Sequence, residues 1–116
     1  MNHDIRAYLH DVCEACRQIL TFTKGCSLEQ YAADDLIKAA VERKFVTIGE
    51  ALARLRRENP VAIEQISGHY RIIGFRNVLV HGYDSIDDAT VWSAVVDSIP
   101  KLVREAESLL EQLPKA

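Results

Sequence analysis

Residues 74–83, with the sequence GFRNVLVHGY, place three side chains close together that could act on a phosphate group. His81 carries an imidazole, which titrates near neutral pH and can act as a general base or a general acid. Arg76 can donate two hydrogen bonds to phosphate oxygens and stabilise negative charge that develops there. Asn77 could orient the imidazole or hold the phosphate. These residue types therefore suit acid–base chemistry on a phosphate.

The spacing of these residues leaves two interpretations open. Asn77 and His81 are four positions apart, so on a helix they share a face and could touch. Arg76 and His81 lie about 140° apart around an ideal helix, and they converge only if the Arg side chain bends round or the helix unwinds near Gly82. The alternative is an ordinary helix C-terminus whose basic residue complements the helix dipole.

The elements that must position this stretch are helices. Apolar residues recur at steps of three and four through most of the chain, which is the period of an amphipathic helix. No convincing strand appears, and short connections favour antiparallel neighbours. We therefore expect an all-α antiparallel bundle of four to five helices. The expected helices cover about residues 5–23, 28–58, 69–81, 87–99 and 101–110, with a short helical segment at 61–66.

Particular residues predict where these helices begin, bend and end. Ser27 and Gln30 form a capping-box signature that opens the second helix. Gly49 is expected to mark a bend in that helix, which is long for a globular protein. Asp87 is a good N-cap, and Pro100 is expected to interrupt the chain between the last two helices.

Length and composition favour one ordinary domain covering residues 1–116. The chain has 116 residues, of which 48% are hydrophobic and 27% charged, as in a globular protein. No apolar run approaches the ~20 residues of a membrane-spanning helix, and the polar N-terminus does not resemble a secretory signal. We therefore expect a cytoplasmic protein without a membrane partner.

The charge is unevenly distributed. The net charge is −3, which argues against indiscriminate nucleic-acid binding. Residues 54–83 form the only segment with a positive net charge, because they contain five Arg and only two acidic residues, Glu58 and Glu64. Arg is the better phosphate binder, although an ordinary mixed surface would explain the same pattern.

Three cysteines raise the question of a metal site. Cys13 and Cys16, with His10 and Cys26, would supply four zinc ligands. A zinc site of this kind needs its cysteine pair on a tight turn, whereas positions 13 and 16 fall on one face of an expected helix. We therefore expect buried cysteines, no disulfide framework and no metal.

The stretch around Arg76 also resembles a known family. Arg76-x4-His81-x-Tyr83, with Asn directly after the Arg, is similar to the signature of HEPN-domain ribonuclease toxins of the HepT type. Residues 41–51, which contain Gly-Glu-Ala, resemble the long second helix of that family. Ile-Asp at 86–87, Val-Trp at 91–92 and Ile-Pro at 99–100 follow in the family's order, so the resemblance covers about residues 5–112.

The resemblance implies a single HEPN-like helical domain that forms a homodimer and cleaves RNA, such as tRNA or mRNA, without a metal or other cofactor. Arg76 and His81 would be catalytic and Asn77 would position the substrate. The implied partner is a nucleotidyltransferase antitoxin that transfers AMP to Tyr83 and thereby silences the toxin. A homodimer also suits the chemistry, because one histidine cannot easily serve as base and acid at once.

Two other functions remain open at this stage. The chain could be a non-catalytic binding partner or a substrate-recruiting subunit of a nucleotidyltransferase, which the negative net charge favours. It could also be a structural helical dimer in which Arg76 and His81 point apart. Glu50, in the middle of the long helix, is expected to be solvated rather than paired with Arg76, and Tyr83 could simply pack half-buried.

Overall fold

The computed structural model describes residues 5–82 and 86–114, and these residues form helices and connecting loops with no β-strand among them. The prediction of an all-α bundle is therefore confirmed. The helices are α1 (Ile5–Phe22), α2 (Leu28–Ala33), α3 (Asp35–Glu58), α4 (Pro60–Ile63), α5 (His69–His81), α6 (Asp88–Ser93), the π-helical segment η1 (Ala94–Ser98) and α7 (Ile99–Gln112).

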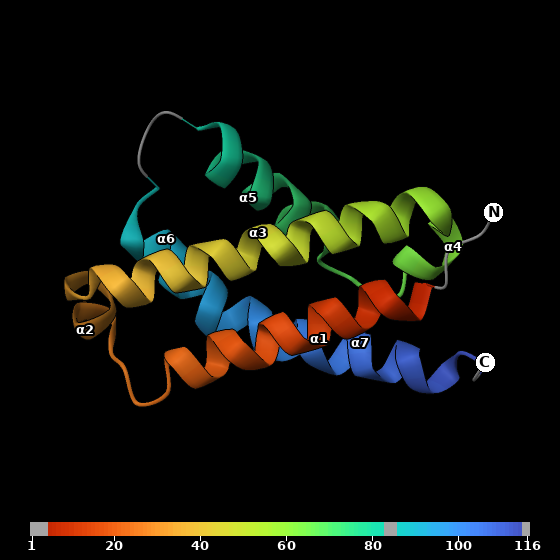
Figure 1. Ribbon diagram of the computed structural model, residues 1–116, viewed down its shortest axis with the longest axis horizontal. Helices are drawn as coiled ribbons and strands as arrows, with labels where there is room; N and C mark the ends of the chain where they lie inside the picture. The colour runs from red at the N-terminus through yellow and green to blue at the C-terminus, as the bar shows by residue number, and fades with distance from the viewer. Residues whose placement is uncertain (1–4, 83–85, 115–116) are drawn as a thin grey trace.

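Three long helices form the body of the bundle (Figure 1). α1 lies between α3 and α7 and runs antiparallel to both, and α5 packs on the other side of α3. The start of α1 and the end of α7 lie at the same end of the molecule, where Arg6 Nη1 donates to the backbone oxygen of Pro114 at 2.8 Å. None of the described helices is both long enough and apolar enough to cross a membrane.

The core is made by the apolar face that each helix turns inward, as the sequence periodicity predicts. Phe45 of α3 meets Phe75 of α5 edge to face, with ring centroids 5.0 Å apart. Near the start of α3, Tyr31 of α2 lies against Trp92 of α6, with ring centroids 5.3 Å apart. The largest fully buried side chains are Tyr31, Phe45, Leu9, Ile19, Ile48, Leu52, Leu55, Ile63, Ile66, Ile99, Val12 and Val41.

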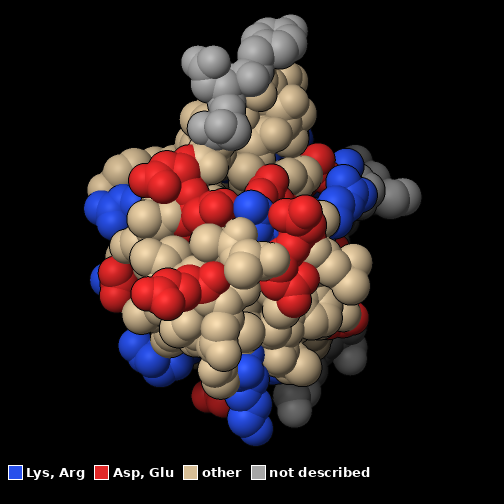
Figure 2. Space-filling view, turned by 90° about the vertical axis from the view of Figure 1, so that its left-hand side faces the viewer, with Lys and Arg blue, Asp and Glu red and all other residues tan. Residues whose placement is uncertain are grey.

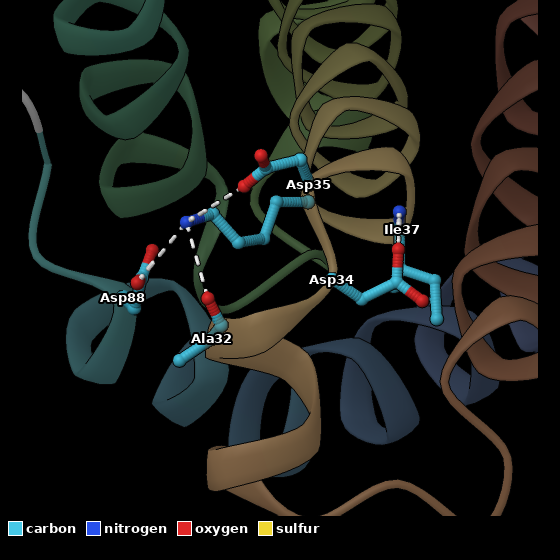
Figure 3. Close-up of polar contacts among 6 residues, drawn as sticks. Ala32, Asp34, Asp35, Ile37 and Asp88 are labelled. Carbon is cyan, nitrogen blue, oxygen red and sulfur yellow. Dashed lines mark hydrogen bonds and ion pairs between the residues drawn. The ribbon is translucent and has the colours of Figure 1, made fainter.

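The second predicted helix is divided at Asp34, so the expectation of one helix over residues 28–58 was wrong, and α3 is continuous through Gly49. The capping box is confirmed, because the Ser27 side chain accepts from Gln30 N and the Gln30 side chain accepts from Ser27 N. Asp34 then ends α2 in an extended conformation, and its carboxylate accepts from Ile37 N at 3.0 Å (Figure 3). Since this N-cap satisfies a free N–H, the chain can begin a new helix there.

Lys38 connects the break between α2 and α3 to helix α6. Its ammonium group donates to the backbone oxygen of Ala32 at 3.4 Å and pairs with Asp88 at 3.3 Å and Asp35 at 3.8 Å (Figure 3). The side chain of Lys38 is only a quarter exposed, so these contacts form in a partly desolvated place. The break therefore joins α2, α3 and α6 into one end of the bundle.

The expected interruption at Pro100 was also wrong. α6 continues through η1 into α7, and Ile99 N–H donates to the oxygen of Ala94, five residues earlier. Pro100 falls in the first turn of α7, directly after this π-helical turn. The prediction that Asp87 caps this helix is confirmed, because its carboxylate accepts from Ala89 N.

Candidate active site

Helix α5 carries the three residues singled out by their chemistry. Gly82 ends the helix, and its N–H donates to the oxygen of Val78 at 2.7 Å. A Cβ at Gly82 would lie 2.5 Å from that same oxygen, so the close approach requires glycine. α5 thus stays helical through His81, and the unwinding that would bring Arg76 and His81 together within one chain does not occur.

Arg76 is seated directly against the backbone of α3. A Cβ built on Gly49 would lie 2.3 Å from the Cβ of Arg76 and 2.7 Å from its Cγ. These distances are far below ordinary carbon–carbon contact, so α5 can approach α3 this closely only because position 49 has no side chain. Gly49 therefore allows Arg76 to pack against α3, and this role was not predicted from the sequence. A glycine in the interior of a long helix could have indicated it, because glycine destabilises a helix unless close packing requires it.

The guanidinium of Arg76 has partners on two helices. Nη1 donates to Oδ1 of Asn77 at 2.6 Å, and Nη2 lies 3.8 Å from Oε1 of Glu50 on α3. The interpretation of Glu50 as a solvated residue was thus wrong, because it is half-exposed and paired. Nε of Arg76 is buried and has no hydrogen-bond partner in the described chain. Arg76, which is 26% exposed, is held in place yet keeps donor capacity toward the surface.

His81 lies in the last turn of α5 and is exposed. Within the described residues it makes no hydrogen bond or ion pair, and the Asn77 side chain accepts from Arg76 instead. The imidazole is thus free to meet a ligand from solvent. The fourth motif residue, Tyr83, lies outside the described residues.

Carboxylates are numerous at one end of the bundle, where Lys and Arg side chains also lie. Figure 2 looks at the end of the bundle formed by α2, α6 and the start of α3, and carboxylates gather there. A polyanion would be repelled from this end and would approach Arg76 from another side. The carboxylates contributed by these elements and by the cap of α6 are Glu29, Asp34, Asp35, Asp87 and Asp88.

The cysteines lie in the places that their helical spacing predicts. Cys13 and Cys16 are buried on the inner face of α1, and burial raises the pKa of the Cys16 thiol to about 12. Cys26 is partly exposed after the end of α1, where Gly25 adopts a φ of +77°. Within residues 5–82 and 86–114, no group of three or more His, Cys, Asp or Glu side chains is arranged to hold a metal ion.

The site is thus an arginine seated between α3 and α5 and an exposed imidazole at the end of α5, within an all-α bundle. Comparison with protein families identifies the protein more closely. The ribonuclease HepT-like family model matches residues 12–109, and this chain belongs to that family. The match includes α3 and α5, the two helices that hold Arg76.

Curated relatives from archaea agree with this assignment. Two proteins of Methanocaldococcus jannaschii, each named "putative RNase", are similar to the chain. One is 32% identical over 113 residues, covering 95% of this chain and 90% of the relative; the other is 29% identical over 104 residues, covering 90% and 94%. A "probable ribonuclease HepT" of Thermococcus cleftensis is 28% identical over 109 residues, covering 94% and 98%. No solved structure matched the chain.

Proposed function

We propose that this protein is a metal-independent endoribonuclease and the toxin of a toxin–antitoxin module, with Arg76 and His81 as its catalytic residues. The observation that carries the proposal is the seat of Arg76 on Gly49 and Glu50, beside a helix end that exposes His81. A cation fixed before the substrate arrives stabilises developing charge without reorganising during the reaction. Membership of the ribonuclease HepT-like family supports RNA as the substrate.

The reaction that fits these groups is an internal transesterification of RNA. A base removes the proton of a 2′-hydroxyl, whose oxygen attacks the adjacent phosphorus, and an acid protonates the departing 5′-oxygen. The products are a 2′,3′-cyclic phosphate and a free 5′-hydroxyl, so no water is consumed in this step. His81 exchanges the proton, Arg76 stabilises the charge on the phosphorane oxygens, and Asn77 holds the Arg76 guanidinium in position.

A homodimer completes the proposed site, because the cleavage needs a base and an acid and each chain offers one motif histidine. Val78 and Val80, which flank the last turn of α5, are 50% and 46% exposed. Exposed valines beside a functional group favour burial against another surface. A second copy related by two-fold symmetry would bury them and bring a second His81 to the same phosphate.

Control of such a toxin would involve Tyr83, two positions after His81 in the chain. We propose that a nucleotidyltransferase antitoxin transfers AMP to its hydroxyl. The added adenylyl group is bulky and anionic, so it would compete with the RNA phosphate for Arg76 and block the strand sterically. The partner enzyme would have to release pyrophosphate from ATP to form this phosphodiester.

The experiment that tests the proposal uses the purified, partner-free protein with total RNA and with tRNA in the presence of EDTA. Cleavage by the wild type and none by His81→Ala or Arg76→Ala would support it, with 2′,3′-cyclic phosphate ends as the chemical signature. Circular dichroism confirms that each variant is folded. Equal cleavage by wild type and His81→Ala would refute the assignment of the site.

A second candidate function is a non-catalytic partner of a nucleotidyltransferase, and the acidic end of the bundle favours it, because that end disfavours RNA. A stable complex with the transferase, together with no cleavage by a protein whose intact mass shows no adenylyl group, would decide for this role. An added mass of one AMP on Tyr83 would instead identify a silenced toxin.

A further inference from the structure

A groove separates α5 from the continuous helix made by α6, η1 and α7. α5 packs on α3, and its opposite flank faces the π-helical segment Ala94–Ser98 across open space. The groove holds a cavity of about 450 Å³ that continues into a second one of about 390 Å³. Volumes of this size are typical of sites for small molecules, and π-helical turns often occur at functional sites.

The two walls of the groove differ in chemistry. α5 contributes apolar surface from Ile72 and Phe75, which forms a floor that a flat ring could cover. The opposite wall presents hydrogen-bonding groups along one side of the helix: the hydroxyls of Thr90, Ser93 and Ser98 and the carboxylate of Asp97. Together with Ala89 and Ala94 these groups give a lining that is largely apolar with a few polar side chains, which is typical of sites for small molecules.

Arg71 and Asp97 line both cavities from opposite walls without pairing with each other. In the part of the chain that the structure describes, Arg71 makes no ion pair or hydrogen bond through its side chain. Asp97 accepts one hydrogen bond, from Ser93 Oγ at 3.2 Å, and its other oxygen has no donor among residues 5–82 and 86–114. The groove therefore offers a guanidinium on one wall and a carboxylate on the other, both available to a ligand.

We propose that this groove binds a guanine base of the RNA substrate. Arginine donates in pairs to O6 and N7 of guanine, and a carboxylate accepts from N1–H and N2–H. Guanine is the only RNA base with two adjacent acceptors on one edge and two adjacent donors on another. It therefore complements Arg71 and Asp97 together, whereas adenine, cytosine and uracil each leave one of them unsatisfied.

The position of the groove suits a substrate subsite. Phe75 and His81 are separated by about 9 Å along the axis of α5. A strand whose phosphate contacts His81 can therefore place a nearby base in the groove. The inference rests on the proposed function for its substrate class, and it adds a sequence preference that the motif residues do not supply, because they contact only phosphate.

The test measures binding by the native protein to 2′-O-methyl uridine hexamers that carry a single guanine, adenine or cytosine nucleotide, also 2′-O-methylated, at each position in turn. These strands cannot be cleaved by 2′-hydroxyl attack, so binding is observed without reaction. We expect guanosine at one position to bind about 5- to 100-fold more tightly than the other bases. Asp97→Asn and Arg71→Gln should each remove most of this preference, whereas Asp11→Asn on the α1–α3 surface should retain it.

Three outcomes would overturn the inference: equal affinity for all four bases, a guanosine preference that survives Asp97→Asn, or a change of oligomeric mass on Asp97→Asn. The last outcome, seen by sedimentation equilibrium, would show that the groove seats a second copy of the chain. Because the strands are uncleavable, guanosine binding by a protein that never cuts RNA would refute the proposed function and leave the guanine site standing.

Discussion

Replacing Gly49 by Ala tests whether α3 positions Arg76. The new methyl group would meet the Cβ of Arg76 at 2.3 Å, whereas carbon atoms in contact prefer about 3.5–4.0 Å. Both atoms are fixed to their backbones, so no change of rotamer relieves the clash. α5 must therefore move away from α3 by about 1.2–1.7 Å at this point.

This displacement is expected to affect both the stability of the protein and its activity. Overpacking of this kind costs about 1–3 kcal/mol, and the better helix propensity of Ala returns roughly 1 kcal/mol. The net loss of about 0–2 kcal/mol leaves the protein folded, since domains of this size are stable by about 5–15 kcal/mol. Activity is more sensitive, because a misplacement of about 1 Å costs on the order of 100-fold in rate.

The assay compares Gly49→Ala with Gly74→Ala, a matched control on α5. Nothing lies within 4 Å of a Cβ at Gly74, so this change should keep full RNA cleavage and raise the melting temperature. Gly49→Ala should lower kcat about 100-fold. If Gly49→Ala proves as stable and as active as Gly74→Ala, the close packing of α3 on Arg76 is not what positions the guanidinium.

Three further outcomes follow from single residues. Ser27→Ala removes the capping box of α2 and should cost about 1 kcal/mol, seen as a melting temperature lower by a few degrees. Tyr31→Phe should be neutral or stabilising in the same measurement, because the buried hydroxyl of Tyr31 has no hydrogen-bond partner in the described chain. At pH 8 a thiol reagent should label Cys26 rapidly and Cys16 only on unfolding, because burial raises the pKa of Cys16 from 9.0 to about 12. With the folded pKa raised, the stability that the neutral Cys16 thiol contributes is complete below pH 9.0 and is lost as the pH rises toward 12, which alkaline denaturation would detect.

Local patterns in the sequence were sufficient for most of the fold. Helical periodicity predicted α1, α5 and the inner faces of the long helices, because burying one face of a helix requires apolar residues at steps of three and four. Ser27, Asp87 and Gly82 were correctly identified as helix boundaries. Their signals depend on hydrogen bonds to residues only a few positions away, so a single sequence carries them in full.

The helix boundaries near Asp34 and Pro100 were not predicted correctly. The interruption of the second helix at Asp34 was not predicted, and Lys38 beside this break pairs with Asp88 of α6. Pro100 was read as an interruption, but the π-helical turn before it leaves the proline in the first turn of α7. In the first case the contact joins residues that are far apart in the sequence. In the second case it is a backbone hydrogen bond that spans five residues instead of four.

The sequence by itself determined the helical bundle and the placement of Arg76, Asn77 and His81 on one helix near its C-terminus. Only the tertiary structure decided that Gly49 and Glu50 of α3 meet Arg76, since that contact joins residues 26 positions apart or more, and its 2.3 Å approach depends on how two helices pack. The groove between α5 and η1 likewise depends on how helices that are separate in the sequence pack together. Periodicity specifies which face of a helix is buried, whereas the distance between two helices follows from the side chains that both of them bring to the contact.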